Sequence, residues 1–192
     1  MQTLNISALK KNLRTEIMER RKKLTEDYCQ AADEKIAHHI IALEEYQSSK
    51  TLFCFVSTED EVNTYPIIRH ALSVGKRVCV PKCISKGFMQ AFEISGTDCL
   101  EKGSYGIMEP NENCPMIISA DIDFCIVPCM SCNTKGQRLG YGGGYYDRFL
   151  SNTVFPSAVV CREKLTCEDI PTLDQDVRIS IVITEAGIWR IK

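Results

Sequence analysis

With 192 residues, a formal net charge of −2 and 44% hydrophobic residues, the chain can bury one core, so we expect a single domain over residues 1–192. The charge argues against a nucleic-acid partner, and no apolar run is long enough to cross a membrane. Eleven cysteines, an odd number, and an amino terminus without the pattern of a signal peptide predict a reduced protein that stays in the cytoplasm.

The first segment predicts a helix with cations on one side. Ser7 is a candidate N-cap, and apolar residues recur at helical spacing from Leu9 to Ile17. Lys10 and Arg14 are one turn apart and would clamp a polyanion if their side of the helix meets a cleft. The alternative is that both are solvated charges, the usual role of such a pair, and the basic run over residues 20–23 is expected to be solvated as well.

Helices and strands then alternate. We expect a helix after Thr25, a buried strand over residues 51–56, a helix capped by Thr64 and a strand over residues 77–81. A strand, helix, strand order predicts parallel pairing. The acidic loop over residues 57–64 follows a strand, and ligands collect at the carboxyl ends of strands in such sheets.

The second half of the chain continues this pattern around a long irregular excursion over residues 95–120. Further strands are expected near an edge at residues 88–94, in the core at 122–127, 157–161 and 179–184, and at the closing edge at 187–191. We therefore predict an α/β fold, Rossmann-like, in which a mostly parallel sheet lies between helices in three layers.

The strand at residues 122–127 leads into a glycine-rich stretch over residues 136–148. Four of the five positions 140–144 are glycine, which lets backbone amides converge on an anion, and a helix starting near Tyr145 would add its positive end. Arg138 offers a planar fork for phosphate oxygens, and Asp147 an oxygen ligand for Mg²⁺. The alternative is a glycine-rich surface turn followed by an aromatic helix start.

Cys129 and Cys132 form a Cys-x-x-Cys pair next to this stretch. A structural zinc site needs four ligands, and Cys114 and Cys125 lack a second paired spacing. A redox motif would begin a helix, whereas residues 133–136 continue a loop. We interpret the pair as chance spacing in a cysteine-rich chain, with a zinc or thiol-redox protein as the alternative.

Histidine chemistry is not favoured, because the chain has only three histidines and no serine, histidine and aspartate arrangement. A glycine loop with basic residues and carboxylates instead suits phosphoryl transfer, which depends on positioning and charge stabilisation. The acidic loop over residues 170–176 would bring a second carboxylate to such a site.

The run from Arg138 to Arg148 resembles the signature of the 5-formyltetrahydrofolate cyclo-ligases, also called methenyltetrahydrofolate synthetases. Other segments resemble the same family along nearly the whole chain: Lys10 to Arg14, Glu61 to Thr64, Gly75 to Val78 with Pro81, Gly106 and Ile107 with Glu109 and Pro110, and Asp176 with Ile183 to Glu185. The resemblance implies ATP- and Mg²⁺-dependent closure of 5-formyltetrahydrofolate to 5,10-methenyltetrahydrofolate, with a phosphorylated formyl intermediate and release of ADP and phosphate.

The resemblance also implies roles for individual residues. ATP would contact Lys10, Arg14, Arg138, Leu139, Gly140, Tyr141, Gly142, Gly143, Gly144, Tyr145 and Tyr146. The folate, with or without a polyglutamate tail, would contact Val56, Glu61, Tyr141, Gly142, Gly143, Gly144 and Tyr145. Asp147 and Asp176 would hold Mg²⁺, and the implied catalytic residues are Glu61, Arg14 and Tyr145. These partners are small molecules, and we expect a monomer.

The chain departs from the family pattern just before the signature. The usual Pro-Gly-x-Ala-Phe-Asp is replaced by Pro-Cys-Met-Ser-Cys-Asn at residues 128–133, without the glycine, the aromatic residue and the acid. Lys164 and Gln175 stand where a glutamine and a histidine are common. The alternative function is therefore a non-catalytic nucleotide- or folate-binding relative of the family.

Overall fold

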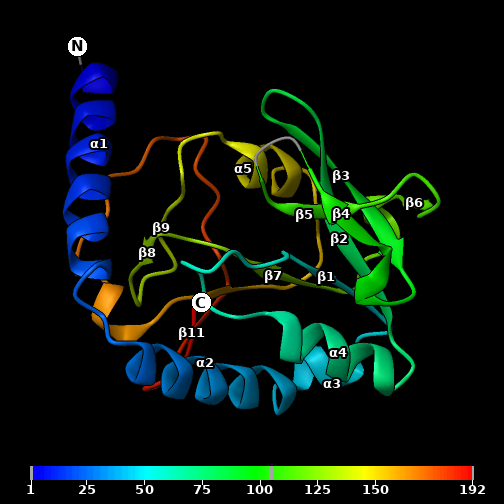
Figure 1. Cartoon of the computed structure of the whole chain (residues 1–192). Coiled ribbons are helices and arrows are strands. Elements are labelled where there is room, and N and C mark those ends of the chain that lie inside the picture. Colours follow the sequence, from blue (N-terminus) through cyan, green and yellow to red (C-terminus); the bar gives the residue numbers. More distant parts are fainter. Residues whose placement is uncertain (1, 104–105, 192) are drawn as a thin grey trace.

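The computed structural model describes residues 2–103 and 106–191, with side chains from residue 5 onward (Figure 1). The parallel strands of its main sheet are β1 (Thr51–Cys54), β2 (Arg77–Ser85), β7 (Phe124–Val127), β10 (Ser157–Val160) and β11 (Ile181–Thr184). The antiparallel strands are β3 (Phe88–Ile94), β6 (Met116–Ile117) and β12 (Gly187–Arg190). These eight strands lie in the order β12-β11-β10-β7-β1-β2-β3-β6.

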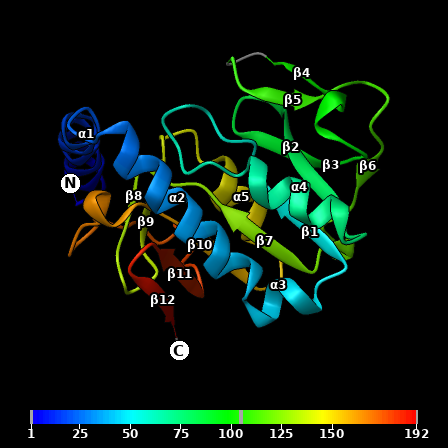
Figure 2. The same cartoon turned by 60° about the horizontal axis from the view of Figure 1, so that its bottom comes forward.

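Helices cover both faces of this sheet. One face packs against α2 (Glu26–Ile41), α3 (Glu44–Ser48) and α4 (Tyr65–Ser73), which lie together below the strands in Figure 1 and cross in front of them in Figure 2. The other face packs against α1 (Gln2–Arg21) and α5 (Tyr145–Leu150). The predicted α/β class, with a mostly parallel sheet between helices, is confirmed.

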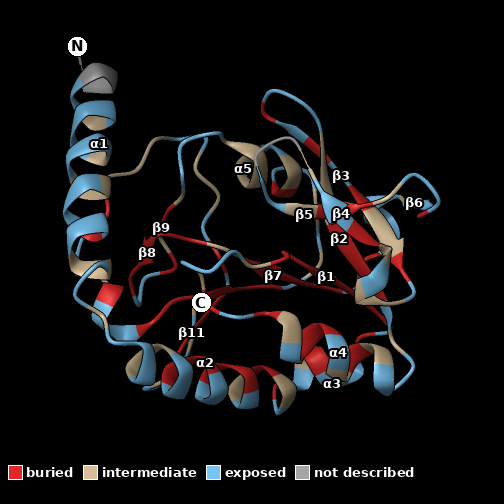
Figure 3. Cartoon of the chain, viewed as in Figure 1, coloured by how far each residue is buried: buried red, intermediate tan, exposed pale blue. Residues whose placement is uncertain are grey.

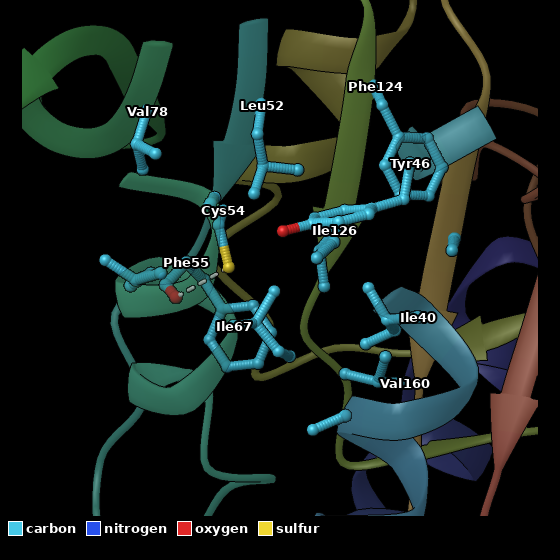
Figure 4. Close-up of a cluster of buried hydrophobic side chains, with 14 of the residues drawn as sticks. Ile40, Tyr46, Leu52, Cys54, Phe55, Ile67, Val78, Phe124, Ile126 and Val160 are labelled. Atoms are coloured by element: carbon cyan, nitrogen blue, oxygen red, sulfur yellow. Dashed lines mark hydrogen bonds between the residues drawn. The ribbon is translucent and has the colours of Figure 1, made fainter. Parts of the chain in front are cut away.

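Strand side chains alternate between the two layers of core. Leu52 and Cys54 point toward α2 and α4, whereas Phe53 between them joins the core under α1 and α5. Figure 4 shows the first core, where Ile67 of α4 lies near Cys54 and Ile40 of α2 lies near Val160. Figure 3 shows the buried strands between half-exposed helices. Because both faces are covered, the central strands appear in the sequence as unbroken apolar runs.

The helix starts agree with the sequence only in part. The Thr25 hydroxyl caps α2 by accepting from the amide of Tyr28 at 3.3 Å, as predicted. Ser7 is not an N-cap, because α1 begins five residues earlier at Gln2. Thr64 precedes α4, but its hydroxyl donates to the carbonyl of Phe55 at 2.7 Å and makes no cap bond.

The described part of the excursion over residues 95–120 is ordered, as predicted, and residues 104–105 lie outside it. It contains one-turn helices at Thr97–Cys99 and Ser119–Asp121, strands β4 (Leu100–Lys102) and β5 (Met108–Pro110), which pair with each other, and β6. β6 pairs with β3, so β3 is next to the edge. A further hairpin, β8 (Ser131–Cys132) with β9 (Arg138–Leu139), leads into the glycine loop, and a one-turn helix follows at Glu163–Leu165. Among the described residues, no helix has both the length and the apolar character that a membrane span requires.

Candidate functional site

A cavity of about 1160 Å³ opens at the carboxyl ends of β1 and β7. Val56 and Pro128 follow these neighbouring strands and line it. From β1 the chain continues to β2 on one side, and from β7 to β10 on the other. Such a point, where connections leave in opposite directions, is where α/β sheets bind ligands.

Segments far apart in the sequence meet at this cavity. The structure places all the predicted site residues along it: Lys10, Arg14, Val56, Glu61, Arg138, Leu139, Gly140, Tyr141, Gly142, Gly143, Gly144, Tyr145, Tyr146, Asp147 and Asp176. This shared location is a finding, whereas the role of each residue stays a prediction.

The glycine loop has a backbone that other residues rarely adopt. Gly142 has φ +101° and Gly144 has φ +67°, and both values lie in the left-handed region. A Cβ atom at Gly142 would stand 3.5 Å from the guanidinium of Arg14, an ordinary van der Waals contact, so the positive φ is what favours glycine at this position. The helix predicted from Tyr145 is α5, which begins directly after Gly144. The loop therefore takes a backbone path that glycine favours, and Gly142 lies next to the cation of Arg14.

Helix α1 supplies the cations. Arg14 Nε donates to the carbonyl of Gly140 at 2.8 Å, and Lys10 forms an ion pair with Asp176. Arg21, two turns further along the same side of α1, donates to the hydroxyl of Tyr141 at 3.4 Å. Burial lowers the pKa of Arg14, and the nearby Asp176 opposes this shift. The alternative that Lys10 and Arg14 are solvated charges is wrong, and so is the expectation that the whole basic run after them is solvated.

The two aspartates predicted as Mg²⁺ ligands approach each other. Asp147 Oδ1 accepts from Arg138 Nη2 at 2.7 Å and from the amide of Val177 at 3.1 Å. Asp176, the residue before Val177, uses Oδ2 to accept from the amide of Leu173 at 2.7 Å. Each carboxylate has a second oxygen to offer, and oxygen atoms are the ligands that Mg²⁺ prefers. The donor set fits this ion.

The same wall has an unsatisfied donor. Arg138 is 8% exposed, and its Nε is buried without a hydrogen-bond partner among the described residues. A buried donor without a partner costs free energy, which an anionic ligand would recover by accepting from it. The guanidinium also lies 5.9 Å from the ring centre of Tyr146. This wall fits a polyphosphate.

Glu61 lies on a loop that borders the cavity. Asp33 and Arg162 hold this loop in place, and the sequence analysis identified neither of them. Glu61 Oε2 accepts from the amide and the hydroxyl of Thr58, at 2.9 and 3.0 Å. Arg162 donates to the carbonyls of Asp60 and Glu61 at 3.2 and 2.6 Å, and it also binds Asp33. Asp33 and Arg162 are far apart in the sequence, and neither belongs to a motif, so no sequence signal marked them.

The lining of the cavity also includes an apolar set, which consists of Phe55, Val56, Pro81, Met89, Ile107 and Pro128. Beside it, the amide of Cys83 donates to the carboxylate of Glu109 at 3.1 Å, and Glu109 is 7% exposed. The lining of the cavity therefore has groups that suit a flat, weakly polar ring and groups that suit an anion with a metal ion.

Fold and site together define an α/β protein with a small-molecule cavity at the switch point of its sheet. The model of the 5-formyltetrahydrofolate cyclo-ligase family matches residues 6–185. The chain therefore belongs to this family, which is a family of enzymes.

Individual relatives agree over nearly their full length. The chain is 26% identical to the 5-formyltetrahydrofolate cyclo-ligase of Mus musculus, with 96% of this chain and 98% of the relative covered. It is 30% identical to a probable 5-formyltetrahydrofolate cyclo-ligase of Caenorhabditis elegans, with 85% and 86% covered. The solved structure of Aquifex aeolicus 5,10-methenyltetrahydrofolate synthetase is similar with a TM-score of 0.84, at 28% identity and with 96% and 93% covered.

Proposed function

We propose that the chain converts 5-formyltetrahydrofolate to 5,10-methenyltetrahydrofolate with ATP and Mg²⁺, releasing ADP and phosphate. The observation that supports this most is the cavity itself, whose lining combines cations, a glycine loop and two aspartates with apolar residues. Membership of the cyclo-ligase family and the similarity to the Aquifex aeolicus synthetase support the same substrate.

In this proposal the charged side of the cavity binds the nucleotide. Lys10, Arg14 and the segment from Arg138 to Tyr146 contact the phosphates, and the bond from Arg14 to Gly140 holds the cation beside the loop before ATP arrives. Asp147 and Asp176 hold Mg²⁺, which supplies a Lewis acid for the phosphate oxygens. Such preorganised charges act without reorganising during the reaction.

The apolar side binds the reduced folate. Val56 and its neighbours contact the ring, and Tyr145, at the start of α5, lies where nucleotide and folate meet. Glu61 orients N10 of the folate toward the formyl carbon and accepts its proton. Thr58 holds the Glu61 carboxylate in position for this role.

The reaction needs ATP because a formamide oxygen is a poor leaving group. The formyl oxygen attacks the terminal phosphorus, and ADP leaves with the electron pair of the broken bond. N10 then attacks the activated carbon, the carbon–oxygen bond breaks, and phosphate departs while N10 loses its proton. Arg14 and the amides of the glycine loop stabilise the charge that develops on the phosphoryl group.

An absorbance assay for the methenyl product tests the proposal. Product should form from 5-formyltetrahydrofolate only when ATP and Mg²⁺ are both present, with one ADP released per product. Calorimetry with ATP alone should be run beside it. Nucleotide binding without any product would contradict the proposal and support the non-catalytic alternative.

The partners in this proposal are ATP and a reduced folate, with or without a polyglutamate tail. The monomeric state and the cytoplasmic location stay predictions. Sedimentation of the purified chain and fractionation of cells that express it would check them.

A further inference from the structure

Three thiols that the proposed reaction does not use lie close together, and two of them precede the glycine loop in the chain. The sulfur atoms of Cys129, Cys132 and Cys161 all lie within 4.8 Å of one another. These residues are 9%, 0% and 3% exposed. Cys129 follows β7, Cys132 lies in β8, and Cys161 follows β10. The third thiol is neither Cys114 nor Cys125, the two cysteines that the sequence analysis considered as further zinc ligands.

The spacing of these sulfurs is close to that of a metal site. In a flat three-coordinate site with metal–sulfur bonds of about 2.3 Å, the sulfur atoms lie about 4 Å from one another. Each sulfur atom would therefore need to move only slightly to bind one ion. Among the described residues, no fourth cysteine, histidine or carboxylate ligand atom joins the three within the same distance. Thiolate ligands without oxygen ligands select soft ions such as Cu(I) and Zn(II) over Mg²⁺.

We propose that Cys129, Cys132 and Cys161 form a three-thiolate site for one soft metal ion. Binding replaces the three thiol protons by three metal–sulfur bonds, and the protons leave to solvent. Arg138, the register partner of Cys132, brings a positive charge beside the cluster, which offsets the negative charge of the thiolates.

A metal ion here would join three parts of the fold. The β8–β9 hairpin pairs Cys132 with Arg138, and the amide of Met130 donates to the carbonyl of Leu139 at 2.8 Å. The ion would bind this hairpin to the ends of β7 and β10, directly before the glycine loop begins. Metal binding to the native chain should therefore stabilise the fold by mass action.

Titration of the reduced, metal-free chain with Cd²⁺ under argon tests the site. We expect one tightly bound ion per chain, with thiolate-to-metal absorption in the ultraviolet, release of the thiol protons and a higher melting temperature. X-ray absorption of the loaded chain should show three sulfur neighbours. Cu(I) should displace the ion, whereas excess Mg²⁺ should not.

Matched variants locate the ion. Cys161→Ala and Cys132→Ala should lose the tight Cd²⁺, whereas Cys79→Ala should keep it, since Cys79 is equally buried at 0% exposure but lies outside the cluster. Circular dichroism checks that each variant folds. If a variant does not fold, the thiolate-to-metal absorption of the unaltered chain still tests the proposal.

Several results would overturn the proposal. They are equal Cd²⁺ binding by Cys161→Ala, a metal shell of oxygen or nitrogen, and displacement of the ion by Mg²⁺. A disulfide between Cys129 and Cys132 in the freshly purified chain, seen by mass spectrometry, would assign the cluster to thiol redox chemistry instead.

Discussion

Arg162 binds the carboxylate of Asp33 with two hydrogen bonds, from Nε to Oδ1 at 2.8 Å and from Nη2 to Oδ2 at 2.9 Å. The two side chains are only 5% and 12% exposed. Asp33 also accepts from the amide of Asn63 at 3.0 Å, and Arg162 reaches the carbonyls of Asp60 and Glu61. A buried ion pair between α2 and the end of β10 thus holds the loop that carries Glu61.

Arg162→Met should reduce the free energy of unfolding by about 3–5 kcal/mol, because it leaves the Asp33 carboxylate buried without a counter-charge. Urea denaturation measures this loss. The control is Arg77→Met, whose partner is Glu93 and whose side chain is 44% exposed, and which should cost less than about 1 kcal/mol. Equal losses in the two variants would show that the buried pair is no more important than a surface pair.

The double variant Asp33→Leu with Arg162→Met should regain most of the stability, since neither charge is then left unpaired. The turnover of the double variant should be lower than that of the unaltered chain, because the carbonyls of Asp60 and Glu61 have lost their donor, as they have in Arg162→Met alone. Measuring kcat and stability on the same preparation separates the two effects. Full turnover in the double variant would restrict Arg162 to a structural role.

Arg14→Ala should weaken ATP binding by roughly 10- to 100-fold. Hydrogen bonds to charged groups contribute about 1.5–3 kcal/mol, and each 1.4 kcal/mol is about a factor of ten in affinity. Calorimetry with the nucleotide measures the change. Lys11→Ala removes an exposed cation from the same helix and should leave the affinity as it is. Unchanged affinity in Arg14→Ala would refute a role for Arg14 in nucleotide binding and leave it only its bond to the carbonyl of Gly140.

Asp147→Asn should lower turnover by on the order of 100-fold or more and raise the Mg²⁺ concentration needed for half-maximal rate. The amide keeps an acceptor for Arg138 and for the amide of Val177, so stability should fall much less than activity. Kinetics over a range of Mg²⁺ concentrations check this. Asp169→Asn, an exposed change with the same chemistry, is the control, and normal turnover in Asp147→Asn would refute the metal role of Asp147.

Cys83 and Cys99 should differ in their reaction with iodoacetamide. Burial raises the pKa of Cys83 to about 11, whereas a hydrogen bond from the Ser95 side chain lowers the pKa of Cys99. The thiolate is the reactive form, so at about pH 8 Cys99 should be labelled first, and Cys83 should become reactive only as the pH rises toward its pKa. Mass spectrometry of the labelled peptides gives both rates.

Ligands should change only one of these two rates. Cys83 lines the cavity, so ATP with 5-formyltetrahydrofolate should slow its labelling while Cys99 reacts as before. Equal protection of both thiols would point to a general tightening of the fold, and no protection of Cys83 would place the ligands elsewhere.

Features that depend on neighbouring residues could be predicted from the amino-acid sequence. Apolar runs such as Thr51 to Val56 marked the buried strands, and the cluster of four glycines over residues 140–144 marked the loop before Tyr145. Both signals are local, because strand burial and backbone freedom are set within a few residues. Alternating strands and helices were enough to predict an α/β sheet.

Which distant residues meet depends on how the whole chain folds. Arg162 and Asp33 are 129 positions apart, and Cys161 joins Cys129 only because β7 and β10 are neighbours in the sheet. The cations of α1 reach the glycine loop for the same kind of reason. Strand order and register fix such contacts, and they result from the packing of the whole chain, which no local pattern of residues records.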